Sequence, residues 1–190
     1  MEDALEQTRL KTLGFWIYLM TDCILFGCLF ATYAVLHNNT FGGPAGRDLF
    51  DMPFVLSETL LLLTSSFTCG LAVVASRRAL KTQVLAWITI TFLLGAAFLT
   101  LELNEFINLA AEDHSWQASA FLSSFFTLVG THGAHISVGL LWALVLGWQF
   151  IKQGFTAGTT RRLVLFSLFW HFLDVIWIFI FTIVYLMGVI

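Results

Sequence analysis

Long apolar runs without charge clusters alternate with short polar segments along the whole chain. Each run reaches about 20 residues or more, the length that an α-helix needs to cross the hydrocarbon layer of a bilayer. A lipid-facing segment must satisfy its backbone hydrogen bonds internally, so each run is predicted to be helical. The pattern predicts an all-α membrane protein with five transmembrane helices, at about residues 13–37, 53–76, 83–110, 116–151 and 162–188.

The segments between the runs carry turn signals and charges. Residues 38–51 contain Gly42, Gly43 and Pro44, which favour a loop, and residues 112–114 form a short acidic segment. The chain has no internal repeat and no low-complexity segment. We therefore expect residues 1–190 to form a single domain, in which the first apolar run is kept as a transmembrane helix.

The basic residues are distributed unevenly between the two sides of such a five-helix protein. Only Arg47 falls on one side, and the other eight fall on the opposite side: Arg9, Lys11, Arg77, Arg78, Lys81, Lys152, Arg161 and Arg162. Basic residues near transmembrane helices concentrate in the cytoplasm. The asymmetry predicts a cytoplasmic N-terminus and a periplasmic C-terminus.

Composition narrows the functional class. Charged residues make up 11% of the chain and hydrophobic residues 58%, which is far from the balance of a soluble domain. No basic patch indicates nucleic-acid binding. Cys23, Cys28 and Cys69 lie inside apolar runs without metal-type spacing, so we expect free, packed thiols.

Eight ionisable side chains within or near the apolar runs are the candidates for function. They are Asp22, Glu58, Glu102, Glu105, His132, His135, His171 and Asp174. Burying such a group in a membrane costs several kcal/mol unless it finds a partner. We therefore expect these residues to form a buried polar network or to hold lipid.

Helical spacing and depth suggest which of these residues meet. Glu102 and Glu105 share a helix face, as do His132 and His135, and His132 is the better partner for Glu102 by depth. Asp22 lies near mid-membrane in the first run, at a depth similar to that of His171 and Asp174 in the last. If these two helices are neighbours, the three residues form one polar site.

Three interpretations of the network stay open. The side chains either tie helices together, or hold lipid headgroups and water, or form a proton route or metal site. A metal site needs a third or fourth ligand at the same depth as a His pair, and no Cys/His cluster supplies it. A haem between His135 and His171 is disfavoured, because their depths differ by ~12 Å on straight helices. We expect no catalytic, cofactor-binding or metal-ligating residue.

Several motifs resemble one family. The stretch FWHFLDVIW at positions 169–177 resembles the last-helix motif of subunit III of haem-copper oxidases. THGAH at 131–135 and LNEF at 103–106 are similar to motifs of its two preceding helices. Asp22 stands where the family usually has a glutamate, one methylene longer. The five-helix form, with GGP at 42–44 and SET at 57–59, is most similar to the branch found in bo-type ubiquinol oxidases.

The resemblance implies an accessory, non-catalytic subunit of a terminal ubiquinol oxidase in a bacterial inner membrane. Such a complex oxidises quinol, reduces oxygen to water and pumps protons. In this family haem and copper belong to subunit I, and subunit III packs against subunit I and holds phospholipid. Subunits II and IV would be further partners.

Three other functions are compatible with the sequence. The first is an accessory protein of nitric oxide reductase within the same family. The second is a small proton-coupled transporter using Asp22 and Asp174, although the chain lacks an inverted repeat and pairs of broken helices. The third is a quinone-binding haem b protein.

Overall fold

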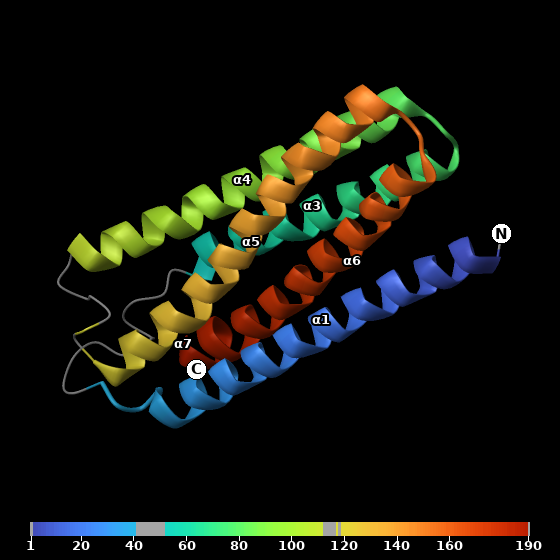
Figure 1. Cartoon of the computed structure of the whole chain (residues 1–190). Coiled ribbons are helices and arrows are strands. Elements are labelled where there is room, and N and C mark those ends of the chain that lie inside the picture. The colour runs from blue at the N-terminus through green and yellow to red at the C-terminus, as the bar shows by residue number, and fades with distance from the viewer. Residues whose placement is uncertain (1, 41–51, 112–116, 118, 190) are drawn as a thin grey trace.

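The structure is a computed structural model that describes residues 2–40, 52–111, 117 and 119–189. The long helices of this part of the chain are α1 (Glu2–Leu36), α3 (Met52–Arg77), α4 (Lys81–Ala111), α5 (Ala120–Gln153) and α6 (Ala157–Ile180) (Figure 1). The last continues as a π-helix, η1 (Phe181–Leu186), and a short helix, α7 (Met187–Val189). Five helical stretches of the described chain are long and apolar enough to cross a membrane, which confirms the predicted all-α, five-span class.

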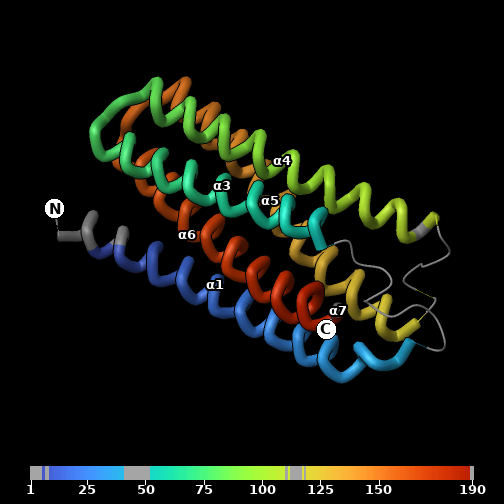
Figure 2. The backbone as a smooth tube through the Cα atoms, turned by 180° about the vertical axis from the view of Figure 1, so that it is seen from behind, coloured from blue at the N-terminus to red at the C-terminus, as the bar shows by residue number. Residues whose placement is uncertain are grey.

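Four of the long helices form a ring, and the first helix lies outside it. Helices α3, α4, α5 and α6 each contact the next, and α6 closes the ring against α3. Helix α1 packs against α5 and α6, along one side of the bundle (Figures 1 and 2). The first and last spans are therefore neighbours, as the hypothesis of a shared polar site requires.

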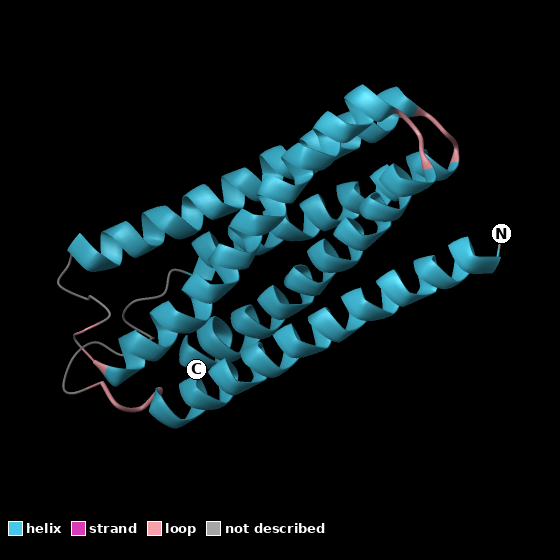
Figure 3. Ribbon diagram, in the orientation of Figure 1, coloured by secondary structure: helices cyan, strands magenta, loops and turns pink. Residues whose placement is uncertain are grey.

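Successive helices run in opposite directions. The N-terminus and the α3–α4 and α5–α6 connections lie at one end of the bundle, and the C-terminus lies toward the other (Figures 1 and 3). The eight basic residues named above therefore belong to the first end, which we call the basic end. Arg47 is outside the described residues. The rule on basic residues continues to predict that the basic end faces the cytoplasm.

Capping side chains determine where two helices begin. Helix α5 begins at Ala120, because the Ser119 hydroxyl accepts a hydrogen bond from the Leu122 amide at 3.1 Å. Helix α6 begins at Ala157, five residues before the expected start, because Thr156 and Thr159 form a reciprocal capping box. The apolar pattern placed these starts at about 116 and 162, because it does not contain the local geometry by which Ser119 and Thr156 cap the helices.

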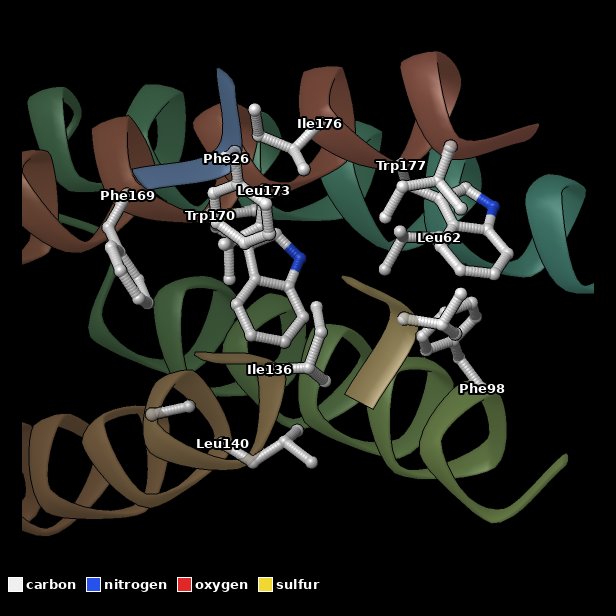
Figure 4. Packing of buried hydrophobic residues seen from close by; sticks show 14 of the residues in the cluster. Phe26, Leu62, Phe98, Ile136, Leu140, Phe169, Trp170, Leu173, Ile176 and Trp177 are labelled. Carbon is white, nitrogen blue, oxygen red and sulfur yellow. The ribbon is translucent and has the colours of Figure 1, made fainter. Parts of the chain in front are cut away.

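Two tryptophans of α6 occupy the centre of the ring. Figure 4 shows the Trp170 indole above Ile136 and Leu140, and the Trp177 indole beside Leu62 and Phe98. Both indoles are buried, and each N–H donates to a hydroxyl of α3. Trp170 Nε1 lies 2.9 Å from Ser65 Oγ, and Trp177 Nε1 lies 3.1 Å from Thr59 Oγ1. These bonds fix the rotation of α6 against α3 and satisfy donors that water cannot reach.

Glycines make room for the Trp170 ring. A Cβ atom on Gly95 of α4 or on Gly139 of α5 would lie 2.7 Å from a carbon of this indole. The Trp170 ring therefore packs against backbone of α4 and of α5 at positions without side chains, and small residues are common where membrane helices pack closely. Gly95 and Gly139 thus make space for one large aromatic side chain.

Candidate functional site

Three carboxyl groups gather between α3 and α4. Glu58 of α3 and Glu102 of α4 are 0% and 1% exposed, and Glu105 lies one helical turn beyond Glu102. Glu58 is close enough to both other carboxyl groups for electrostatic interaction. We call Glu58, Glu102, Glu105 and the nearby Tyr185 the carboxyl cluster. At this depth each of these carboxyl groups must either be protonated or have a partner that stabilises its negative charge.

The π-helix η1 supplies the tyrosine of the carboxyl cluster. The Tyr185 hydroxyl donates a hydrogen bond to Glu105 Oε2 at 3.1 Å, and the side chain is fully buried. Another hydroxyl, from Tyr33 of α1, donates to the Val184 carbonyl in the same π-helix at 3.4 Å. A π-helix shifts the register of its side chains and occurs often at functional sites. In this protein, residues of the π-helix connect the last span to α4 through Tyr185 and to α1 through the Val184 carbonyl.

Glu102 reaches across to α5 at a glycine. Its Oε1 atom lies 2.8 Å from the point where a Cβ atom on Gly133 would be. Both of its carboxyl oxygens and both ring nitrogens of the adjacent His132 are buried without a hydrogen-bond partner among the described residues. Glu102 and His132, which depth predicts to be partners, therefore form no hydrogen bond with each other in the described chain, and the carboxyl group packs on the neighbouring backbone.

His132 lies among aromatic rings. It is 0% exposed and stacks on Trp177 with 5.2 Å between ring centroids. The Phe98 ring lies at 6.0 Å and nearly perpendicular to it, and Phe26 of α1 lies at 6.4 Å. The His132 ring is thus packed as a flat aromatic group within the bundle.

His135 turns away from His132 toward α1. Its Nδ1 atom donates to the Thr131 carbonyl at 2.7 Å, which directs Nε2 to Asp22 Oδ1 at 3.7 Å. Asp22 is buried, and Tyr18, one turn earlier on α1, also interacts with it. This contact joins the peripheral helix α1 to the ring. The shared helix face of His132 and His135, predicted from their spacing, therefore does not give the two histidines the same partners.

The hypothesis of one site for Asp22, His171 and Asp174 is also wrong. Asp22 pairs with α5, whereas Asp174 of α6 is buried near Ser66 of α3. His171 is exposed, and its Nδ1 donates to the Ser167 carbonyl of its own helix at 2.6 Å. Asp22 and Asp174 lie at similar depth on neighbouring helices, but they do not meet, because Asp174 is directed from α6 toward α3 and not toward α1.

Sequence reasoning missed the two tyrosines that accompany the carboxylates. Tyr18 lies four residues before Asp22, and this helical spacing was a signal that could have placed them together. Tyr185 carries no such signal, since it stands alone in an apolar run and its contact with Glu105 depends on the π-helix. The eight predicted residues therefore separate into the carboxyl cluster with His132, the Asp22–His135 contact, and Asp174 with His171 nearby.

This arrangement joins helices through polar contacts at several depths. Within the part of the chain that the structure describes, no three His, Cys, Asp or Glu side chains gather in a way that could hold a metal ion. The buried groups can donate and accept hydrogen bonds and can hold protons. The fold and these contacts define a multi-pass helical membrane protein whose buried polar side chains link every long helix to another.

Comparison with known proteins identifies the family. The family described as cytochrome c oxidase subunit III matches residues 6–189, nearly the whole chain. The protein belongs to this family, whose members are subunits of the haem-copper oxidases of respiratory chains, as the motifs at 131–135 and 169–177 predicted.

Several relatives are similar over almost their full length. The chain is 58% identical to cytochrome bo(3) ubiquinol oxidase subunit 3 of Pseudomonas aeruginosa, over 92% of this chain and 84% of the relative. It is 50% identical to quinol oxidase subunit 3 of Bacillus spizizenii, over 99% and 92%. It is also 47% identical to cytochrome c oxidase subunit 3 of Bacillus sp. strain PS3, over 99% and 91%.

Proposed function

We propose that this protein is the accessory third subunit of a proton-pumping terminal ubiquinol oxidase in a bacterial inner membrane. It packs against subunit I, which carries the haem and copper, and it stabilises that subunit without taking part in the chemistry. Subunits II and IV complete the assembly. The observation that carries this proposal is the 58% identity over 92% of the chain to a subunit 3 of a bo(3) ubiquinol oxidase.

The contacts within the bundle support a stabilising role. The carboxyl cluster and the Asp22–His135 contact connect helices, and both tryptophan N–H groups of α6 bond to α3. The buried ionisable residues then act as polar contacts at several depths that fix helix positions. A rigid helical surface of this kind is suited to hold a neighbouring membrane subunit in place.

The outer surface of the bundle supports contacts with lipid and with another membrane protein. Helix α1 exposes large apolar side chains along its length, among them Trp16, Ile17, Met20 and Ile24. In a bilayer such a face lies against acyl chains or against an apolar helix of a partner. Phospholipid bound at the bundle surface forms part of the proposed function.

Affinity purification of the tagged chain in mild detergent tests the proposal. We expect a large haem-containing subunit to co-purify, with ubiquinol oxidase activity and without reactivity toward reduced cytochrome c. Deleting the gene for this chain should lower the amount or the thermal stability of the assembled oxidase more than its initial rate per haem. Purification of the chain alone, with no haem protein, would contradict the proposal.

A second candidate is the third subunit of a cytochrome c oxidase. The 47% identity to such a subunit from Bacillus sp. strain PS3 favours it. The two candidates differ in the electron donor, so the same purified complex assayed with ubiquinol and with reduced cytochrome c separates them. Nitric oxide reduction by the complex would assign it instead to nitric oxide reductase.

A further inference from the structure

A groove opens on the surface of the bundle between α4 and α5. Its volume is about 430 Å³, and its walls are almost wholly apolar. Ile88, Phe92 and Leu93 of α4 form one wall, and Leu144, Gly147 and Trp148 of α5 form the other. Gly147 keeps the groove open, because nothing lies within 4 Å of the position of a Cβ atom there.

Two lysines stand at the mouth of this groove, at the basic end. Lys152 Nζ lies 5.2 Å from the ring centroid of Trp148, in a cation–π contact. Lys81 Nζ donates a hydrogen bond to the carbonyl of Ile151, another residue of the groove lining, at 3.1 Å. An ammonium group has three donors. Each lysine therefore keeps capacity for an anion above the apolar groove.

The groove has the depth of one leaflet. On α5 its lining extends from Ala143 to Ile151, about 12 Å along the helix axis. The hydrocarbon layer of one leaflet is about 15 Å deep. A transmembrane helix of a partner would need apolar contacts through both leaflets, whereas an acyl chain needs them only from the headgroup to mid-membrane.

We propose that the α4–α5 groove binds one phospholipid with an anionic headgroup, whose phosphate lies between Lys81 and Lys152. One acyl chain lies along Gly147 and Trp148. This inference rests on the proposed phospholipid binding and assigns it a place and a headgroup charge. A basic residue near a membrane surface contributes about 1 kcal/mol toward anionic lipid, so each lysine should favour the anionic headgroup about fivefold.

A second groove on the same molecule provides a matched comparison. It lies between α1 and α6, has a volume of about 310 Å³, and is lined by Trp16, Met20, Cys23, Leu168, His171 and Phe172 among others. Among the described residues, no lysine or arginine belongs to its lining. It can accept an acyl chain, but it offers no fixed positive charge to select a headgroup.

The test uses the purified oxidase assembly that contains this chain, after removal of lipid by detergent exchange. Dioleoyl phosphatidylglycerol or dioleoyl phosphatidylcholine is added back, and bound lipids are counted by native mass spectrometry. The variant Gly147→Leu fills the groove, and Gly27→Leu is its control, because Gly27 also has nothing within 4 Å. Lys81→Gln and Lys152→Gln test the headgroup, with Lys11→Gln, a basic residue of α1, as the control.

We expect Gly147→Leu to lose one tightly bound phosphatidylglycerol that Gly27→Leu retains. Lys81→Gln and Lys152→Gln should each reduce the preference for phosphatidylglycerol over phosphatidylcholine about fivefold, and Lys11→Gln should leave it unchanged. Equal lipid counts in Gly147→Leu and Gly27→Leu would overturn the groove assignment while leaving phospholipid binding elsewhere intact. Absence of retained phospholipid in every variant, including the wild type, would contradict the proposed lipid binding itself.

A crosslinking experiment decides between lipid and protein as the occupant. A photoreactive phenylalanine derivative at position 144, in the groove wall, should form adducts with phosphatidylglycerol in membranes of known composition. Crosslinking mainly to another subunit of the assembly would overturn the proposal, since the groove would then be a subunit interface.

Discussion

The carboxyl group of Glu102 rests on the backbone of Gly133, with Oε1 2.8 Å from the position that a Cβ atom would take. A methyl group cannot enter this space unless Glu102 moves. We predict that Gly133→Ala lowers the stability of the bundle by about 1–3 kcal/mol, as overpacking of a buried site does. Thermal denaturation of the purified assembly measures this as a lower Tm.

A shorter side chain at position 102 should relieve that strain. We expect Glu102→Ser to recover part of the loss in the Gly133→Ala background. Gly27→Ala is the control, because its added methyl group has nothing within 4 Å and lies outside the proposed lipid groove. A Gly133→Ala protein as stable as the Gly27→Ala protein would show that Glu102 moves aside without cost.

The hydrogen bond from Trp170 to Ser65 gives a second prediction. Ser65→Ala leaves a buried indole N–H without its acceptor. We expect a double-mutant cycle of Ser65→Ala with Trp170→Phe to give a coupling of about 0.6 kcal/mol, the average for hydrogen bonds between membrane helices. Additive effects of the two substitutions on unfolding would mean that the bond contributes nothing measurable.

Asp22 and Asp174 should behave as independent sites. They contact different helices and share no partner among the residues that the structure describes, so the stability losses of Asp22→Asn and Asp174→Asn should add within about 0.5 kcal/mol. Asp22→Asn and His135→Gln, in contrast, remove the same contact and should be non-additive. Unfolding of the three single and two double variants decides this, and strong coupling between the aspartates would refute the separation.

The Tyr185 hydroxyl bonds to a carboxyl oxygen that lies among other acidic groups. We expect Tyr185→Phe to cost about 1–3 kcal/mol, the penalty of leaving a buried polar atom unpaired. In a Glu105→Leu background the same substitution should cost less, because this acceptor is already gone. Equal costs in both backgrounds would indicate that the bond to Glu105 contributes nothing measurable.

The orientation of the bundle in the membrane is open to a direct test. The basic end is predicted to face the cytoplasm, with the C-terminus outside. Alkaline phosphatase fused after Ile190 should be active, since it folds only outside the cytoplasm, and green fluorescent protein fused there should be dark. Fluorescence at this position would reverse the predicted topology.

The helical class was predictable because the membrane imposes it. Apolar runs of sufficient length allow no other structure in lipid, and every expected run corresponds to a long helix of the described chain. The starts of α5 and α6 were harder to predict, because Ser119 and Thr156 act as caps only through the local backbone geometry. The hydrophobic pattern does not contain that information.

The contacts within the candidate site were predictable only by depth. Depth correctly placed Glu102 close to the 132–133 region, but it could not say which way each side chain turns. His132 and His135 are three residues apart, yet one faces the aromatic core and the other faces Asp22. Such choices depend on how the helices rotate about their axes, which large side chains such as Trp170 and Trp177 determine together.

The position of α1 outside the ring has a consequence for biosynthesis. Its neighbours among the described elements are α5 and α6, so the partner of Asp22 is made roughly a hundred residues after Asp22 itself. At the usual rate of translation this interval lasts about 5–20 s. During that time a carboxyl group at mid-membrane has no histidine to meet. Helix α1 is therefore in the membrane before α5, which carries His135, has been made. Any factor that shields Asp22 during this interval would act before the bundle has formed.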